Sequence, residues 1–284
     1  MTMNHTTLID ATSLAGLLDS SDVVVVDCRF SIKDPQQGPQ AYRAGHIPGA
    51  VYADLNKDLS GPIMVGVTGR HPLPDMASFA ETLSRWGIDG DVQVVAYDDA
   101  TAAPACRLWW MLKWMGHDRV AVLNGGWSHW QRSGLPKQAD VPTPKPRTFH
   151  ASPRPELIIS AREAAEFAEN PNRLLVDSRA AARYRGEVEP IDPVAGHIPG
   201  AINGPYEDNL DESGLLRDVP SLAARFDRLF GTCQANDVAF YCGSGVSAAN
   251  NLLACVHAGR GLPKLYPGSW SEWIADPKRP IATG

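Results

Sequence analysis

The sequence lacks the features of a membrane protein, a secreted protein or a nucleic-acid-binding protein. No apolar run reaches the ~18 residues that a membrane-spanning helix needs, and the N-terminus has neither the basic stretch nor the apolar core of a secretory signal. The 284 residues carry a formal net charge of −6, whereas nucleic-acid binding needs clustered Lys and Arg. We therefore expect a cytoplasmic protein that binds neither membranes nor nucleic acid.

Cysteine is scarce, and its spacing is irregular. An odd number of cysteines without any C-x-x-C pair predicts no disulfide framework and favours a reducing compartment. Their spacing relative to the histidines matches no common zinc pattern, so we expect no metal and no cofactor. The cysteines are Cys28, Cys106, Cys233, Cys242 and Cys255.

What the sequence does contain is an internal repeat. Each half has an apolar run ending in Asp-x-Arg, the segment AGHIPGA, a second apolar run and a pair of tryptophans, in that order. Four matched features in one order indicate duplication of a domain. These features occupy residues 23–29, 44–50, 92–98 and 127–130 in the first half, and residues 174–179, 195–201, 238–242 and 270–273 in the second.

Each half also alternates two kinds of segment. Short Val-rich runs are typical of buried parallel strands, and longer mixed segments such as 221–231 are typical of helices. The sequence therefore predicts an α/β protein of two tandem domains, each a mostly parallel sheet flanked by helices. Several prolines between the halves predict an extended linker. We place the first domain at 1–137, the linker at 138–157 and the second domain at 158–284.

The loop after the apolar run 238–241 has the composition of an anion cradle. Two glycines alternate with small residues from Cys242 to Ser247, and a helix is expected from Ala248. Glycines let several amide N–H groups point at one atom, and the helix N-terminus adds partial positive charge. Cys242 is therefore predicted to have a lowered pKa and to act as a thiolate nucleophile, as covalent sulfur chemistry requires. The other four cysteines are expected to be small core residues.

The residues of the same loop disfavour two other chemistries. Cysteine phosphatases place an arginine six positions after the cysteine, where this chain has Ala248. The G-x-S-x-G pattern of serine hydrolases is absent from the loop.

The first half of the chain lacks a cysteine at the corresponding position. Asp98 stands there instead, and an aspartate cannot form a persulfide, so we expect only the second half to be catalytic.

The paired halves, the two HIPGA segments and the loop CGSGVS resemble the tandem rhodanese-type sulfurtransferases over nearly the whole chain. The loop is similar to that of the 3-mercaptopyruvate branch, because the thiosulfate branch carries basic residues after its cysteine. The resemblance implies transfer of a sulfane sulfur from 3-mercaptopyruvate, through a persulfide on Cys242, to cyanide or to a thiol acceptor such as a thioredoxin-like protein. Two alternatives remain open: thiosulfate as the donor, and a non-catalytic rhodanese-like module that binds partners.

The resemblance also implies roles for individual residues. Ser244 would pass a proton to the enolate, supported by His46 and Asp34, and Arg183 would bind the donor carboxylate. The place of a second expected arginine falls on Ile191 or a neighbour, which leaves Arg185 or another residue to replace it. The loop amides would stabilise the terminal sulfur of the persulfide, and the residues concerned are Gly243, Gly245, Val246 and Ser247. His197 in the second HIPGA segment is expected to be structural.

Overall fold

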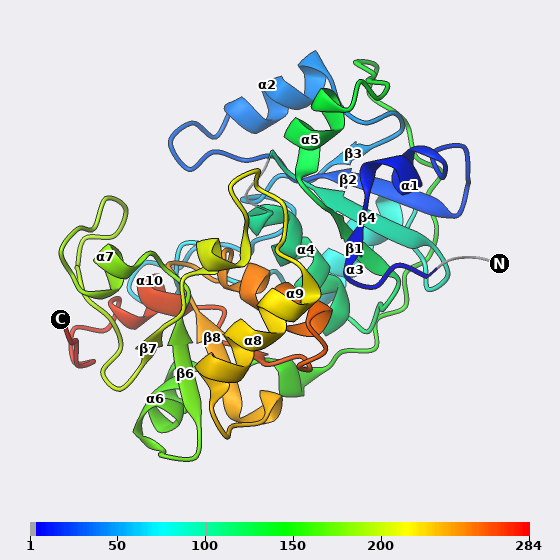
Figure 1. Ribbon diagram of the computed structural model, residues 1–284. Helices are drawn as coiled ribbons and strands as arrows, with labels where there is room; N and C mark the ends of the chain where they lie inside the picture. The colour runs from blue at the N-terminus through cyan, green and yellow to red at the C-terminus, as the bar shows by residue number, and fades with distance from the viewer. Residues whose placement is uncertain (1–3, 100–101) are drawn as a thin grey trace. The chain divides into compact units, whose positions relative to one another are not determined.

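The computed structural model describes residues 4–99 and 102–284 (Figure 1). The chain divides into two compact units, and each exchanges a short segment with the other half of the sequence. Unit 1 comprises Met1–Gly61, Pro74–Arg154 and Glu212–Leu215. Unit 2 comprises Pro62–Leu73, Pro155–Asp211 and Leu216–Gly284. The segment Pro62–Leu73, which lies well inside the expected first domain, therefore belongs to the unit that contains Cys242.

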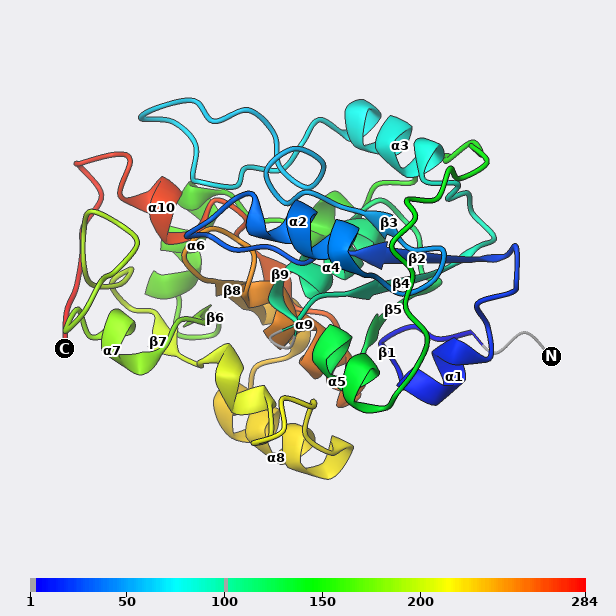
Figure 2. The same ribbon diagram turned by 90° about the horizontal axis from the view of Figure 1, so that it is seen from above.

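Unit 1 is built on a five-stranded parallel sheet of order β1-β5-β4-β2-β3. Its strands are β1 (Leu8–Ile9), β2 (Val23–Asp27), β3 (Val51–Tyr52), β4 (Gln93–Tyr97) and β5 (Val120–Leu123). Its helices are α1 (Ala11–Ala15), α2 (Gln37–Ala44), α3 (Met76–Arg85), α4 (Ala103–Trp114) and α5 (Gly126–Arg132). In Figure 2 the sheet lies between α3 on one side and α1 with α5 on the other.

Unit 2 is built on a four-stranded parallel sheet of order β7-β6-β8-β9. Its strands are β6 (Leu174–Asp177), β7 (Ile202–Asn203), β8 (Val238–Tyr241) and β9 (Lys264–Leu265). Its α-helices are α6 (Ala161–Glu169), α7 (Ala181–Tyr184), α8 (Val219–Phe230), α9 (Ala248–His257) and α10 (Ser269–Trp273). Short 3₁₀ turns are η1 (Pro155–Leu157), η2 (Tyr206–Asn209) and η3 (Ala235–Asp237). The predicted α/β class with two parallel sheets flanked by helices is confirmed.

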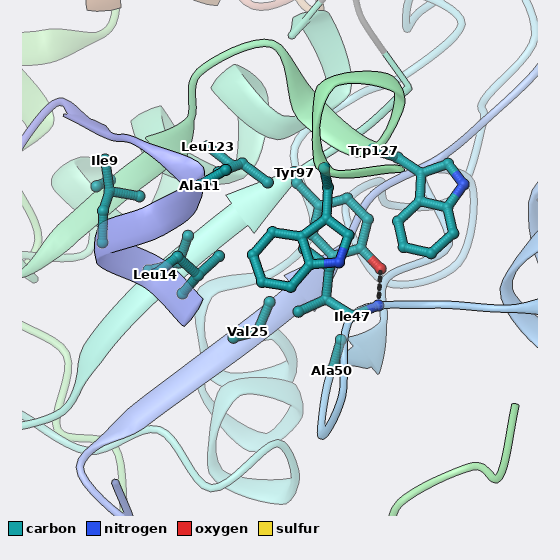
Figure 3. Close-up of a cluster of buried hydrophobic side chains, with 12 residues drawn as sticks. Ile9, Ala11, Leu14, Val25, Ile47, Ala50, Tyr97, Leu123 and Trp127 are labelled. Atoms are coloured by element: carbon teal, nitrogen blue, oxygen red, sulfur yellow. Dashed lines mark hydrogen bonds between the residues drawn. The ribbon is translucent and has the colours of Figure 1, made fainter. Parts of the chain in front are cut away.

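Successive side chains of each strand point to opposite faces of its sheet, and both faces are covered by helices. In β8, Ala239 and Tyr241 pack with α6 and α10 in one apolar cluster. The intervening Phe240 points to the other face, where its ring lies 6.3 Å from that of Phe230 in α8. In unit 1 the equivalent cluster joins β2, β4, β5, α1 and α5 around Tyr97, whose hydroxyl accepts from the amide of Ile47 (Figure 3). Burial on both faces explains why the strands are continuously apolar in sequence.

The duplicated Asp-x-Arg motif forms the same buried ion pair in both units. In unit 1 the guanidinium of Arg29 lies 2.6 Å from Asp27 and donates to the carbonyl of Gly45 over 2.7 Å. In unit 2 Arg179 lies 2.6 Å from Asp177 and donates to the carbonyl of Gly196 over 2.7 Å. Each pair ties the end of a strand to the AGHIPGA segment of its own unit, so the motif is part of the architecture.

Helix starts follow the local sequence. Ser160 and Glu163 form a reciprocal capping box at the start of α6, and Asp218 caps α8 by accepting from the amide of Ser221. Among the residues that the structure describes, we find no helix with both the length and the apolar character required to cross a bilayer.

Candidate active site

Cys242 follows β8 directly, and its side chain is buried at the carboxyl end of the central strand pair of unit 2. The helix α9 begins at Ala248, as the sequence predicts. Between them Gly245 has a φ of +73°, and an added Cβ would collide with the carbonyl group of Pro267. The loop can therefore take its course only with glycine at this position.

The loop lowers the pKa of the Cys242 thiol. Burial on its own raises the pKa, but hydrogen bonds from the Ser247 hydroxyl and from the amides of Ala248, Ser244 and Val246 outweigh it. These donors stabilise the thiolate. Of the residues expected to act through their amides, Val246 does so, while Ser247 acts through its hydroxyl and the amides of Ser244 and Ala248 join the set.

The other buried cysteines have the opposite electrostatic setting. Burial raises the pKa of Cys255 to about 12, and it raises the pKa of Cys28 and of Cys106 well above the ordinary value. Burial alone therefore keeps a thiol protonated in this protein, and the hydrogen bonds around Cys242 account for the difference.

A tight turn leading into α10 fixes the loop from behind. The Ser269 hydroxyl accepts from the amide of Cys242 over 3.1 Å, donates to the carbonyl of Tyr266 over 2.9 Å, and lies 4.0 Å from the sulfur. The amides of Trp270 and Ser271 donate to the carbonyls of Cys242 and Gly243 over 3.0 and 2.9 Å. Ser269 itself has a φ of +55°, which is uncommon for a residue with a side chain. No sequence motif marks Ser269 as part of the site.

Ser244 is paired with a histidine from the segment Pro62–Leu73. The Nδ1 atom of His71 lies 2.8 Å from the Ser244 hydroxyl, and both side chains are buried. The backbone before His71 is held on α10, because the amide of Arg70 donates to the Ser271 hydroxyl over 3.0 Å. The segment thus delivers an imidazole to the loop that carries Cys242.

The structure gives His46, the histidine expected to support Ser244, a different place. His46 lies in unit 1, with Nδ1 2.8 Å from the Tyr42 carbonyl oxygen and its ring stacked on that of Tyr42 at 4.1 Å. His197 repeats both contacts in unit 2, with Tyr184 at 2.8 Å and 3.8 Å. A contact present in both copies belongs to the duplicated scaffold, and the histidine that the structure places at Ser244 is His71.

Asp34 also has a local role in unit 1. It is exposed in the turn before α2, and its carboxylate accepts from the amide of Gln36 over 2.9 Å. This contact is typical of an aspartate that orders a turn.

Two guanidinium groups converge beside Gly243, the residue after the nucleophile. A Cβ built on Gly243 would lie 3.1 Å from Nη2 of Arg70 and 3.6 Å from Nη2 of Arg183. Arg183 forms a bidentate ion pair with Glu189, in which Nε donates to Oε2 over 3.1 Å and Nη2 donates to Oε1 over 2.7 Å. The predicted position of Arg183 at the loop is therefore accompanied by a second arginine that sequence reasoning missed.

Neither Ile191 nor Arg185, the positions considered for a second arginine, supplies a guanidinium group to the loop. Ile191 is exposed to solvent. Arg185, the replacement suggested by the sequence, pairs with Glu187 at 2.6 Å, and both side chains are largely exposed. The second guanidinium at the loop comes instead from Arg70, which precedes His71 in the segment Pro62–Leu73.

Unit 1 has a carboxylate where unit 2 has the thiol. Asp98 follows β4 and accepts from the amides of Ala102 and Ala105 over 2.9 and 3.2 Å. Burial raises the pKa of this carboxyl group to about 7. The side chain of Asp98 therefore occupies these two amide donors.

Comparison with known proteins agrees with this geometry. The model of the rhodanese-like domain matches residues 10–133 and again residues 160–276. The chain belongs to the rhodanese-like family. It is 47% identical over 283 residues to a probable 3-mercaptopyruvate sulfurtransferase of Pseudomonas aeruginosa, covering 99% of this chain and 100% of that protein. It is also 39% identical to a putative thiosulfate sulfurtransferase of Mycobacterium tuberculosis, covering 98% and 97%.

Solved structures of rhodanese-like proteins support the same assignment. The crystal structure of a 3-mercaptopyruvate sulfurtransferase from Escherichia coli superposes with a TM-score of 0.80 at 32% identity, covering 94% of this chain and 100% of that one. The 3-mercaptopyruvate sulfurtransferase from Leishmania major gives a TM-score of 0.82 at 30% identity, covering 96% and 75%. This rhodanese-like chain is therefore a sulfurtransferase enzyme with two rhodanese-like repeats.

Proposed function

We propose that this enzyme takes a sulfane sulfur from 3-mercaptopyruvate, holds it as a persulfide on Cys242 and passes it to a thiol or to cyanide. The observation that carries the proposal is the environment of Cys242, whose pKa is lowered by one hydroxyl and three amide donors despite complete burial. The same donors that stabilise a thiolate also suit the terminal sulfur of a persulfide anion.

In the first step the Cys242 thiolate attacks the sulfur of 3-mercaptopyruvate. A sulfur–sulfur bond forms while the sulfur–carbon bond of the donor breaks, and its electron pair leaves on carbon as the enolate of pyruvate. The persulfide keeps the transferred sulfur, and the enolate takes up one proton at that carbon to become pyruvate. This division of the reaction into two transfers is the usual advantage of a covalent intermediate.

The proton for the enolate can come from Ser244. The His71 imidazole lies 2.8 Å from the hydroxyl, so it can return a proton to the serine as the serine gives one up. Burial of both side chains keeps this proton transfer away from bulk water. Thiosulfate releases sulfite, which is a stable anion without an enolate, so a serine–histidine pair has a use with mercaptopyruvate that it lacks with thiosulfate.

The carboxylate of the donor would be bound by Arg183 and Arg70. Both guanidinium groups face Gly243, which places them beside the nucleophile. Each guanidinium group has N–H donors beyond those used by Glu189 and Asp192, and charged donors of this kind are suited to orient the carboxylate of a keto acid.

In the second step an acceptor thiolate attacks the outer sulfur of the persulfide, and Cys242 leaves as a thiolate ready for another cycle. We propose that the acceptor is a small thiol or a thioredoxin-like protein. All five cysteines are free, which is compatible with the reducing cytoplasm in which we propose the enzyme acts.

The test compares the two donors on the purified enzyme. Mass spectrometry after incubation with 3-mercaptopyruvate should find one added sulfur atom on the Cys242 peptide, and Cys242→Ser should abolish the addition. Thiosulfate is the second candidate donor, because one relative that covers nearly the whole chain is named for it. A higher kcat/KM with thiosulfate than with 3-mercaptopyruvate would reverse the donor assignment.

A further inference from the structure

A buried carboxylate joins the two arginines of the donor site. The side chain of Asp192 is 2% exposed, and its Oδ1 atom pairs with Nη1 of Arg70. Its Oδ2 atom lies 3.2 Å from Nη2 of Arg183. The backbone of Asp192 is fixed as well, because its amide donates to the Glu189 carboxylate over 3.0 Å. Asp192 therefore contacts the same guanidinium groups that we assign to the donor.

The carboxylates change the charge balance of this site. Arg70 and Arg183 contribute two positive charges, and Asp192 and Glu189 contribute two negative charges, of which Glu189 also pairs with Arg179 at 3.2 Å. Asp177 lies 2.6 Å from Arg179, so the cluster is neutral overall although it has three guanidinium groups. The Oδ2 atom of Asp192 would lie 3.7 Å from a Cβ on Gly243, so its negative charge stands next to the loop that carries the nucleophile.

We propose that Asp192 is a specificity-determining residue, which selects monoanionic sulfur donors such as 3-mercaptopyruvate over dianionic donors such as thiosulfate. The proposal rests on the proposed function. The repulsion between a fixed carboxylate and a bound donor grows in proportion to the donor charge, so Asp192 penalises a dianion about twice as strongly as a monoanion. Burial keeps solvent and salt from screening this difference.

Glu189 holds Arg183 through two hydrogen bonds, whereas the guanidinium of Arg70 pairs with Asp192 itself. An asparagine at position 192 keeps an oxygen that can accept from Arg70, so the substitution removes the charge and retains a hydrogen-bond acceptor. Specificity of this kind, in which a repulsive group excludes the wrong ligand, is a common form of discrimination.

The experiment measures how fast each donor loads sulfur onto Cys242 in a single turnover, in wild-type enzyme and in Asp192→Asn. Burial raises the pKa of Asp192, so the rates are measured at a series of pH values up to about 8 in order to include the ionised carboxyl group. We expect Asp192→Asn to shift the ratio of the two rate constants towards thiosulfate by about tenfold. Asp192→Glu keeps the charge and should keep the wild-type preference.

Glu187→Gln is the matched control, because it removes one negative charge from an exposed side chain of the same loop. It should leave the ratio unchanged, since exposed charges are screened. Asp192→Ser removes the same charge as Asp192→Asn with a smaller side chain, and provides the answer if the asparagine variant does not fold. Equal changes for both donors, or an unchanged ratio in a folded variant, would overturn the assignment of Asp192. Failure of wild-type Cys242 to gain sulfur from either donor would instead refute the proposed function itself.

Discussion

The imidazole of His71 lies 2.8 Å from the hydroxyl of Ser244, although the two residues are 173 positions apart in the sequence. Ser244 stands two residues after Cys242, on the loop that lowers the pKa of the thiol. The pair is therefore placed where a proton is needed when the donor carbon loses its sulfur. This relationship leads to the first of five predictions.

Replacing His71 by Ala should slow the release of pyruvate more than it weakens donor binding. A positioned acid–base group typically contributes 10²–10⁴-fold to a rate, so we expect kcat with 3-mercaptopyruvate to fall by about 10² with KM little changed. The rate of sulfur loading from thiosulfate should change much less, because sulfite needs no proton on carbon. Equal losses with the two donors would argue for a purely structural role of His71.

Replacing His46 by Ala should reduce stability and spare the rate. The substitution removes the ring stacked on Tyr42 and the hydrogen bond to its carbonyl group, which together correspond to about 1–3 kcal/mol of unfolding free energy. Thermal denaturation measures this loss. Activity per folded molecule should match wild type. A kcat as low as that of the His71 variant would return His46 to the active site.

Replacing Arg70 or Arg183 by Gln should weaken binding of the donor carboxylate. A hydrogen bond to a charged group contributes about 1.5–3 kcal/mol, so KM for 3-mercaptopyruvate should rise by about 10- to 100-fold in each variant. Arg185→Gln is the matched control, because that side chain forms an exposed pair with Glu187. If its KM rises as much as that of the other two, the assignment of the donor site is wrong.

Replacing Ser247 by Ala should raise the pKa of Cys242. The Ser247 hydroxyl is the strongest of the groups that lower it, while burial acts in the opposite direction. The rate of alkylation by iodoacetamide should therefore rise at a higher pH in the variant than in wild type. At about pH 7 wild-type Cys242 should react faster than the other cysteines. Overlapping pH profiles for the two proteins would show that the hydroxyl does not stabilise the thiolate.

Replacing Asp98 by Asn should change how stability depends on pH. The pKa of Asp98 is about 7 in the folded protein, against an ordinary value of 3.8. Between these values the folded state binds a proton that the unfolded state does not, so this group stabilises the fold at low pH and the contribution is lost as pH rises towards 7. The slope is at most about 1.4 kcal/mol per pH unit.

Urea unfolding at several pH values measures that slope. The asparagine variant should lack this contribution between about pH 4 and 7 and should gain stability relative to wild type at higher pH. If both proteins showed the same pH dependence of stability, the pKa of Asp98 would not be raised in the folded state.

The parts of the fold that local sequence determines were predictable. Residues 23–26 and 238–241 are apolar because both faces of each sheet are covered, and apolar runs of that length indicate buried strands. The course of the loop from Cys242 to Ser247 could be read from its glycines, since Gly245 has the positive φ that its position demands. These features depend on neighbours in the sequence.

The parts of the site that depend on long-range packing were not predictable in the same way. His71 and Arg70 reach the loop only because their segment packs in unit 2, and no local pattern encodes that path. Ser269 is held in its unusual backbone conformation by hydrogen bonds to Cys242 and Tyr266. His46 is conspicuous in a motif that occurs in both halves, and it makes the same two tyrosine contacts as His197 in the other copy.

The segment Pro62–Leu73 limits how far the two repeats can become independent. It leaves the first half of the sequence and supplies Arg70 and His71 to the second unit. A polypeptide that began after the proline-rich stretch could still form the strands and the cysteine loop, but it would lack one guanidinium and the imidazole. A gene encoding only that repeat would therefore specify an incomplete enzyme, and this shared segment gives natural selection a reason to keep the two copies in one chain.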